Sequence, residues 1–341
     1  MSIDKHLVKK ASLEKLFAVL KQQGKTMVAP LLRNGKVSYE TTDNFADITC
    51  DYIQTTQSAK TAVFPRTETL FNYTKDKEGT SIKDFDPQSV PEVIVWGVRP
   101  CDASGFAPLS AIFNWDFKDN LFNTRMQKTT VIGFSCNKAD EYCFCTSVGG
   151  NPGGETGNDI LFTKLGVDGD YLAEIITDKG KVIVNLAPEL FELPQNIEKE
   201  KYLANIPVKF NREDIKGKLE AFFESEVWAE QSMRCLGCGA CAYVCPTCAC
   251  FDIQDEVHGK NGTRVRCWDS CGFSMFTMHT SGHNPRGIQS QRWRQRLMHK
   301  FSYMPERLSV YGCTGCARCS RACPVDMNIL EHLIAMQEIK K

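Results

Sequence analysis

The chain has 341 residues, 41 Lys and Arg against 41 Asp and Glu, and 17 cysteines. A chain of this length is long for one hydrophobic core and sufficient for two domains. Non-specific binding of nucleic acid requires an excess of basic residues, and the balanced charge therefore makes nucleic acid an unexpected partner. The odd number of cysteines in so large a chain, at ligand-like spacings, argues against disulfides and for a reducing compartment, so we expect a cytoplasmic protein.

Residues 1–24 predict an amphipathic helix, in which apolar residues alternate with lysines (Leu7, Leu13, Leu16, Phe17 and Leu20). No uninterrupted apolar region with a small-residue cleavage site follows them, and no run in the chain approaches the roughly 18 apolar residues of a membrane span. We therefore expect neither a signal peptide nor membrane insertion.

Strand and helix patterns then alternate. We expect a hairpin at 26–42 around Arg33-Asn34-Gly35, buried strands at 93–98 (VIVWGV) and 130–134 (TVIGF), a helix at 103–113 between them, and a further strand at 181–185. Strands that alternate with helices predict an α/β domain with a partly parallel sheet.

Four cysteines of this α/β domain form a pattern of their own. Cys101 and Cys136 each follow a predicted buried strand, and Cys143 and Cys145 lie in the loop after Cys136. Open α/β sheets place their sites at strand ends, so these thiols are candidates for a third [4Fe–4S] cluster or for a zinc ion. The alternative is ordinary buried cysteines, which are common in protein cores.

A polar, charged stretch at 196–214 marks a domain boundary. We divide the chain into an α/β domain, residues 1–210, which carries the candidate extra iron–sulfur site, and a second domain, residues 211–341. A helix at 215–230 leads into the second domain.

The second domain contains one cysteine pattern twice, C-x2-C-x2-C-x3-C-P. The two runs are Cys235, Cys238, Cys241 and Cys245, followed by Pro246, and Cys313, Cys316, Cys319 and Cys323, followed by Pro324. This is the spacing of proteins with two [4Fe–4S] clusters, in which the fourth cysteine of each run binds the other cluster. We therefore assign Cys235, Cys238, Cys241 and Cys323 to one cluster, and Cys313, Cys316, Cys319 and Cys245 to the other. A tetrahedral zinc ion would not need the third and fourth cysteines of each run.

The long insert between the runs shows little strand pattern and a helical stretch at 288–301, so we expect an α-helical dicluster ferredoxin-like domain. Arg292, Arg296 and Lys300 form one basic stripe, which either faces the negatively charged clusters or is a solvent or docking surface. The remaining cysteines, Cys248, Cys250, Cys267 and Cys271, either line the clusters, replace a ligand or pack in the core, and Cys50 has no visible partner.

With these residues in view, the chain resembles the family that includes the A-type subunit of anaerobic sulfite reductase and the beta subunits of sulfhydrogenase-type nickel–iron hydrogenases. The matching segments are ETLF at 68–71, GVRPCDA at 97–103, CFC at 143–145, CPTCAC at 245–250, Ser270-Cys271, His299-Lys300 and the second cysteine run. The resemblance implies that a neighbouring flavin (FAD) subunit oxidises NAD(P)H, and that this chain relays electrons between it and a catalytic redox subunit.

No Ser/His/Asp arrangement, paired carboxylates or nucleotide fingerprint stands out, so we expect an electron-transfer subunit of a multisubunit oxidoreductase without a substrate site of its own. One alternative is a subunit of a flavin-linked heterodisulfide-reductase type complex. From another class, the alternative is an iron–sulfur redox sensor, but the sequence shows no output module such as a helix-turn-helix.

Overall fold

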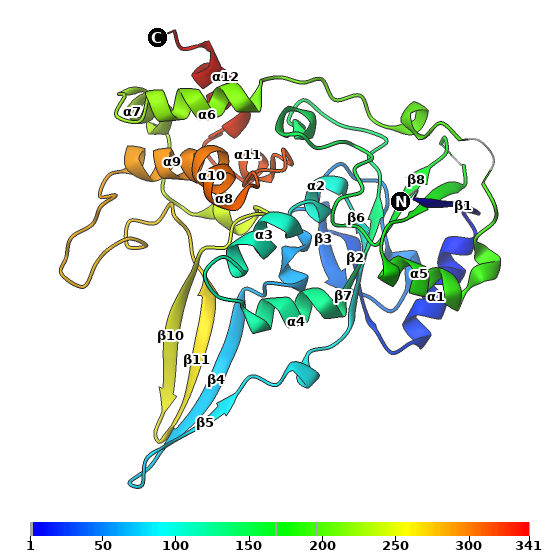
Figure 1. The fold of residues 1–341 in the computed structure, drawn as a ribbon, viewed down its shortest axis with the longest axis horizontal. Coiled ribbons are helices and arrows are strands. Elements are labelled where there is room, and N and C mark those ends of the chain that lie inside the picture. Colours follow the sequence, from blue (N-terminus) through cyan, green and yellow to red (C-terminus); the bar gives the residue numbers. More distant parts are fainter. Residues whose placement is uncertain (1–2, 168, 195–196, 341) are drawn as a thin grey trace.

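A computed structural model describes residues 3–167, 169–194 and 197–340, and two β-sheets organise it (Figure 1). The first sheet has the strand order β1-β9-β8-β7-β6-β2-β3 and the second the order β10-β11-β4-β5. The strands are β1 Asp4–Val8, β2 Thr26–Arg33, β3 Lys36–Thr41, β4 Thr67–Lys75, β5 Thr80–Asp84, β6 Val93–Val98, β7 Thr129–Phe134, β8 Ile160–Lys164, β9 Tyr171–Ile175, β10 Phe251–His258 and β11 Asn261–Trp268.

The α-helices are α1 Ser12–Gln22, α2 Pro100–Ala103, α3 Phe106–Phe113, α4 Asn120–Lys128, α5 Asp178–Leu186, α6 Arg212–Ala221, α7 Val227–Ser232, α8 Ala240–Tyr243, α9 Gln289–Met298, α10 Met304–Leu308, α11 Arg318–Arg321 and α12 Ile329–Glu338. Among the described residues, none of the helices is long and apolar enough to cross a membrane.

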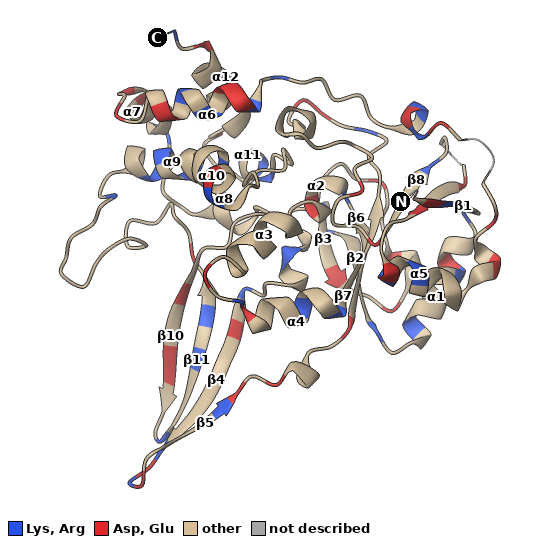
Figure 2. Cartoon of the chain, viewed as in Figure 1, with Lys and Arg blue, Asp and Glu red and all other residues tan. Residues whose placement is uncertain are grey.

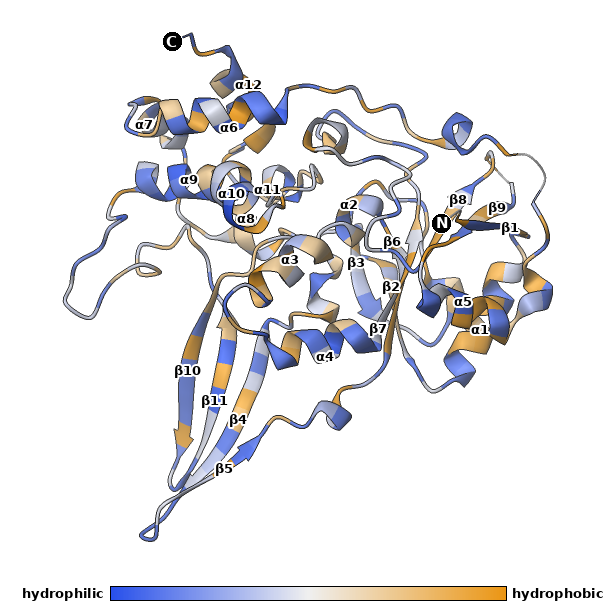
Figure 3. Cartoon of the chain, in the orientation of Figure 1, coloured by the Kyte–Doolittle hydropathy of each residue, from blue (hydrophilic) through white to orange (hydrophobic). Residues whose placement is uncertain are grey.

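The centre of the seven-stranded sheet is parallel, from β2 through β6 and β7 to β8, and its outer pairs are antiparallel. The predicted α/β domain with a partly parallel sheet is therefore confirmed. Strand β6 is apolar along its length because helices cover both faces: Ile94 and Trp96 belong to the core under α1 and α5, whereas Val95 belongs to the core with α3 and α4. Figure 3 shows these central strands among the hydrophobic segments.

The second sheet joins distant parts of the chain. Strand β11, from the insert between the cysteine runs, pairs antiparallel with β4, and its partner β10 lies at the sheet edge. Buried Glu68 of β4 receives hydrogen bonds from Arg266 of β11 and from Arg125 of α4, so charge pairing fixes the junction. Figure 2 shows the charged residues along these strands and at their tips.

This sheet corrects the expectation of little strand structure in the insert, and the structure does not bear out a purely α-helical C-terminal domain. Strand β10 is exposed along almost its whole length, and Asp255 interrupts the face that Phe251, Ile253 and Val257 form, so the apolar alternation that identifies a strand in a sequence is weak there. The division near residue 210 stays a prediction, although strands from both sides of it share this sheet. The polar, charged stretch at 196–214, near which we place the domain boundary, begins at a residue outside the described ranges.

Three predicted elements differ in detail. Residues 181–185 lie in helix α5 and not in a strand, because only Ile183 of this apolar segment is buried. Residues 4–8 form β1 and precede α1 instead of starting the helix. The helix predicted at 215–230 is two helices, α6 and α7. The helix at 288–301 is confirmed as α9, continued by the π-helical turn η7 (His299–Tyr303).

Helices α6, α7, α9 and α12 pack around a separate apolar core beside the cysteine runs. Its fully buried members include Leu219, Leu297, Phe301 and Leu333. This core gives the loops that carry the cysteines a rigid support.

Candidate iron–sulfur centres

The first cysteine set lines one cavity; it consists of Cys235, Cys238, Cys241 and Cys323. Positive φ angles of 65° at Gly237 and 73° at Gly239 let the backbone turn between these cysteines. A Cβ atom at Gly239 would lie 2.5 Å from the Phe273 ring, so only glycine fits there. Four thiols around one hollow are the donor set that a [4Fe–4S] cube requires.

Donors and apolar walls surround this set. The Gln289 side-chain amide lies 3.0 Å from Cys235 Sγ, and the backbone N–H of Met327 lies 3.2 Å from Cys323 Sγ. N–H groups that point at sulfur stabilise thiolates and cluster sulfur atoms. Trp293 and Ile329 form part of the wall. Burial raises the pKa of Cys241 to about 12, and Arg296 opposes the shift, so a bound metal would have to keep this thiol deprotonated.

The thiols of the second cysteine set raise one another's pKa. This set consists of Cys313, Cys316, Cys319 and Cys245. Burial raises the pKa of Cys313 to about 12, Lys300 lowers it, and the neighbouring Cys319 and Cys245 sulfurs raise it further. Cys245 and Cys319 also raise the pKa of Cys316. Each thiol therefore lies within electrostatic reach of at least two others of the set.

The placement of the two fourth cysteines agrees with the crossed arrangement. Cys323 belongs to the second run but lines the cavity of the first, and Cys245 belongs to the first run but acts on Cys313 and Cys316. Cys319 of the second set also borders the first cavity. The ligation itself stays a prediction.

The third cysteine set lines a cavity of its own; it consists of Cys101, Cys136, Cys143 and Cys145. Cys101 follows β6 and Cys136 follows β7, and because these strands are parallel neighbours, their ends lie at the same edge of the sheet. Burial raises the pKa of Cys145 to about 12, and the Cys136 and Cys143 sulfurs add to the shift. The four thiols thus meet as their positions predict, and metal binding by them stays a prediction.

The third set touches the second run directly. Cys316 lines the third cavity together with the four thiols. The Phe144 N–H donates to the Gly315 carbonyl at 3.1 Å, and a Cβ atom at Gly315 (φ 67°) would lie 2.5 Å from the Cys145 backbone. Only a glycine at position 315 permits the two backbones to approach this closely.

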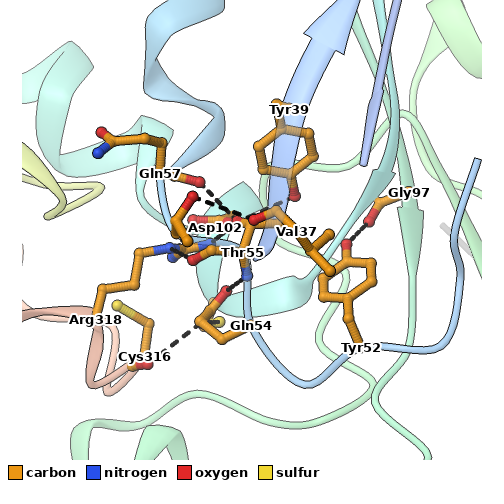
Figure 4. A network of polar contacts seen from close by, with 12 residues as sticks. Val37, Tyr39, Tyr52, Gln54, Thr55, Gln57, Gly97, Asp102, Cys316 and Arg318 are labelled. Carbon is orange, nitrogen blue, oxygen red and sulfur yellow. Dashed lines mark hydrogen bonds and ion pairs between the residues drawn. The ribbon is translucent and has the colours of Figure 1, made fainter. Parts of the chain in front are cut away.

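A buried ion pair fastens the same junction, as Figure 4 shows. Arg318, between Cys316 and Cys319, binds both carboxylate oxygens of Asp102 and donates to the Thr55 carbonyl at 2.9 Å. The two side chains are 1% and 0% exposed. Burial lowers the pKa of Arg318, but Asp102, the Cys316 and Cys101 sulfurs and Tyr39 together outweigh burial and raise the pKa above its usual range. Beside them, the Gln54 amide lies 3.4 Å from Cys101 Sγ and donates to the Cys316 carbonyl at 3.2 Å.

The basic stripe of α9 and η7 points at the cysteines and not into solvent. Arg296 and Lys300 are both buried. Lys300 Nζ lies 3.3 Å from Cys245 Sγ, and an Arg296 guanidinium nitrogen lies 3.7 Å from Cys248 Sγ. Burial lowers the pKa of Lys300, but the Cys245 and Cys248 sulfurs reverse the shift and keep the ammonium charged. Of the two roles considered for the stripe, the structure favours the one that faces the cysteines.

Among the described residues, no three or more His, Cys, Asp or Glu side chains gather around a single-ion position. A [4Fe–4S] cube does not need a single-ion position, because each thiolate binds a different iron.

Several contacts near the cysteine sets could not be predicted from the sequence. Asp102 and Arg318 stood within recognised motifs, yet nothing in the spacing showed that they pair. Arg99 donates to the Ser135 carbonyl at 3.1 Å and the Cys50 carbonyl at 3.0 Å, which ties the strand ends near the third set. Lys60, which lies beside Cys248, carried no sequence signal at all.

Comparisons with known proteins agree with this geometry. Residues 234–327 match the 4Fe-4S dicluster domain, which implies two [4Fe–4S] clusters. The chain is 28% identical over 333 residues to Sulfhydrogenase 2 subunit beta of Pyrococcus furiosus, with 95% of each chain covered. No solved structure matches. The resemblance predicted from the motifs is therefore confirmed: the chain carries a 4Fe-4S dicluster domain and is similar along nearly its whole length to a sulfhydrogenase beta subunit.

Proposed function

We propose that this chain is the iron–sulfur electron-transfer subunit of a cytoplasmic multisubunit oxidoreductase. It relays electrons between an FAD subunit that reacts with NAD(P)H and a catalytic subunit of the nickel–iron hydrogenase or sulfite reductase type. The similarity to a sulfhydrogenase beta subunit supports the assignment, as does the dicluster domain.

The observation that carries the proposal is the continuity of the three cysteine sets. Cys319 of the second set borders the first cavity, and Cys316 of the second set borders the third cavity. The second set therefore lies between the other two, and clusters held there would form an unbroken series. Cys235, Cys238, Cys241 and Cys323 would hold one [4Fe–4S] cluster, Cys313, Cys316, Cys319 and Cys245 the second, and Cys101, Cys136, Cys143 and Cys145 the third. When bound, such clusters supply one-electron steps.

The residues around the sets have identifiable tasks in this relay. Arg296 and Lys300 place buried positive charge beside the thiolates, which stabilises the more negative reduced state of a cluster. Arg318 and Asp102 hold the second set against the third. Gln289 and the Met327 N–H orient sulfurs of the first set.

Iron analysis of the full chain, purified anaerobically, tests the third set. Cys136→Ala should remove about four irons and four acid-labile sulfides per chain, because one cube is lost. Cys50→Ala is the matched control, since Cys50 lies in the same domain and outside the third cavity, and it should leave the iron content unchanged. Equal iron content in the two variants would remove the third cluster from the proposal.

A reduction assay tests the relay role. Dithionite should bleach the clusters of the isolated chain, whereas NADH and NADPH should not, because the flavin subunit is the one that reacts with the nucleotide. Direct reduction by either nucleotide would show that this chain has a nucleotide site of its own and would contradict the proposal.

A further inference from the structure

A cavity of about 180 Å³ lies next to the dicluster cysteines and is not accounted for by the three sets. Three further cysteines line it, Cys248, Cys250 and Cys271, together with Arg286, Arg296, His299 and Lys300. None of these cysteines belongs to the repeated pattern. We call Cys248, Cys250 and Cys271 the insert set.

The β10–β11 hairpin brings the insert set together. Its base pairs Phe251 with Trp268, so the residues before and after the hairpin lie side by side. The Asp269 N–H donates to the Cys250 carbonyl at 2.9 Å, and Cys250 and Cys271 both line the cavity. The sheet that the sequence did not predict is thus what delivers Cys271 to this cavity.

Buried positive charge surrounds the insert set. Lys60 donates to the Cys248 carbonyl at 3.0 Å, Arg296 reaches Cys248 Sγ, and Lys300 lines the cavity wall. All three side chains are buried. Buried ammonium and guanidinium groups are costly without negative charge beside them, and three in one place repel each other. The site therefore suits thiolates and an anionic occupant.

We propose that Cys248, Cys250 and Cys271 are the thiolate ligands of a further [4Fe–4S] cluster in this cavity, with His299 as the ligand of its fourth iron. Three thiols, buried cations and a cavity fit a cube better than a disulfide, which would need two thiols and no space. His299 lines the same cavity, and imidazole is a common metal ligand.

A cluster at this position would extend the proposed relay. The inference rests on the proposed function, in which the chain carries iron–sulfur clusters. Cys271 also lines the first cavity, and Lys300 of this cavity's wall lies 3.3 Å from Cys245 Sγ of the second set. A cluster here would contact both dicluster sites and provide a second route between them.

Iron and labile sulfide analysis of the full chain tests the inference. Cys250→Ser and Cys271→Ser should each lose about four irons relative to the unaltered protein, because each removes a ligand of one cube. Cys267→Ser is the matched control, since Cys267 lies on β11 within the same hairpin but does not line the cavity, and its iron content should not change. Unchanged iron in both ligand variants would overturn the inference.

Two measurements keep the test decisive if a ligand variant folds poorly. Mössbauer spectroscopy of the unaltered protein enriched in ⁵⁷Fe should show about four irons more than the first, second and third sets account for, with one iron of distinct parameters because of His299. His299→Ala should change that component alone. Iron that the first, second and third sets account for in full would refute the further cluster and leave the proposed function intact, whereas a chain without any iron would refute both.

Discussion

The two cysteine runs have the same spacing but lie in different surroundings. In the first run Cys238 is exposed, and its neighbour Leu236 is 67% exposed. In the second run Cys316 is buried, and Arg318 beside it is locked to Asp102. The spacing of a run therefore determines which kind of cluster it can hold, whereas its packing determines whether that cluster exchanges electrons with a partner protein or only with other clusters inside the molecule. We expect the first set to be the point of exchange and the second set the internal relay.

The largest expected effect follows from the crossed arrangement. Cys245→Ser should disrupt the cluster of the second run and Cys323→Ser the cluster of the first, because each removes a thiolate from the other run's cube. Electron paramagnetic resonance of the reduced variants distinguishes the exposed from the buried cluster. If each substitution changed only the cluster of its own run, the crossed assignment would be wrong.

The second prediction concerns the junction that buries the second run. Arg318→Met should lower stability by about 3–5 kcal/mol, because it leaves the Asp102 carboxylate buried without a partner. Thermal unfolding under anaerobic conditions measures the change. Asp255→Asn, which breaks the solvent-exposed pair with Arg264, is the control and should leave the stability nearly unchanged, because water screens such a pair. Similar losses in both variants would mean that the Asp102 pair does not fasten the junction.

The third prediction compares cations near the two runs. Lys300→Met should lower the reduction potential of the second cluster by on the order of 60 mV, the equivalent of a tenfold change in a one-electron equilibrium, because a buried charge beside Cys245 is lost. Arg292→Met should lower the reduction potential of the first cluster by a smaller amount than Lys300→Met lowers that of the second, because Arg292 is only half-buried and water screens its charge. Redox titration followed by spectroscopy measures both, and equal shifts would contradict the difference in burial.

The smallest expected effect is a pH dependence near the first run. Burial lowers the pKa of His332 to about 4, and its ring packs 4.9 Å from that of Trp293, which lines the first cavity. As the pH falls, the unfolded chain, with a histidine pKa near 6.5, binds the proton before the folded chain does. Protonation of His332 therefore leaves the free energy of unfolding unaffected well above pH 6.5 and lowers it progressively as the pH falls toward 4. Between about pH 7.5 and 5.5 the loss should be about 1 kcal/mol. Denaturation of His332→Phe should show a flatter profile, and an identical slope would exclude His332 as the cause.

Much of the site could be predicted from the sequence because cluster ligation leaves a local signal. The two cysteine runs and the strand-end positions of Cys101 and Cys136 needed only spacing and the rule that parallel strands end at one edge. The hairpin of β10 and β11 gave only a weak signal, because Asp255 interrupts the short apolar face of its exposed strand, on which only Phe251, Ile253 and Val257 are apolar. The pairing of Asp102 with Arg318 joins residues 216 positions apart, and no local pattern contains such a contact.

The pairing of β4 with β11 has a consequence for the synthesis of the protein. Strand β4 leaves the ribosome almost two hundred residues before β11, and until β11 arrives its inner edge has no partner and Glu68 has no Arg266. Contacts so distant along the chain form slowly, and unpaired edges promote aggregation. The hairpin that closes this sheet is also the one that positions Cys250 and Cys271. Completion of the nascent chain therefore shields an exposed strand and assembles a group of thiols in the same event, so a cell that makes this protein has to bring iron to a chain that is already nearly finished.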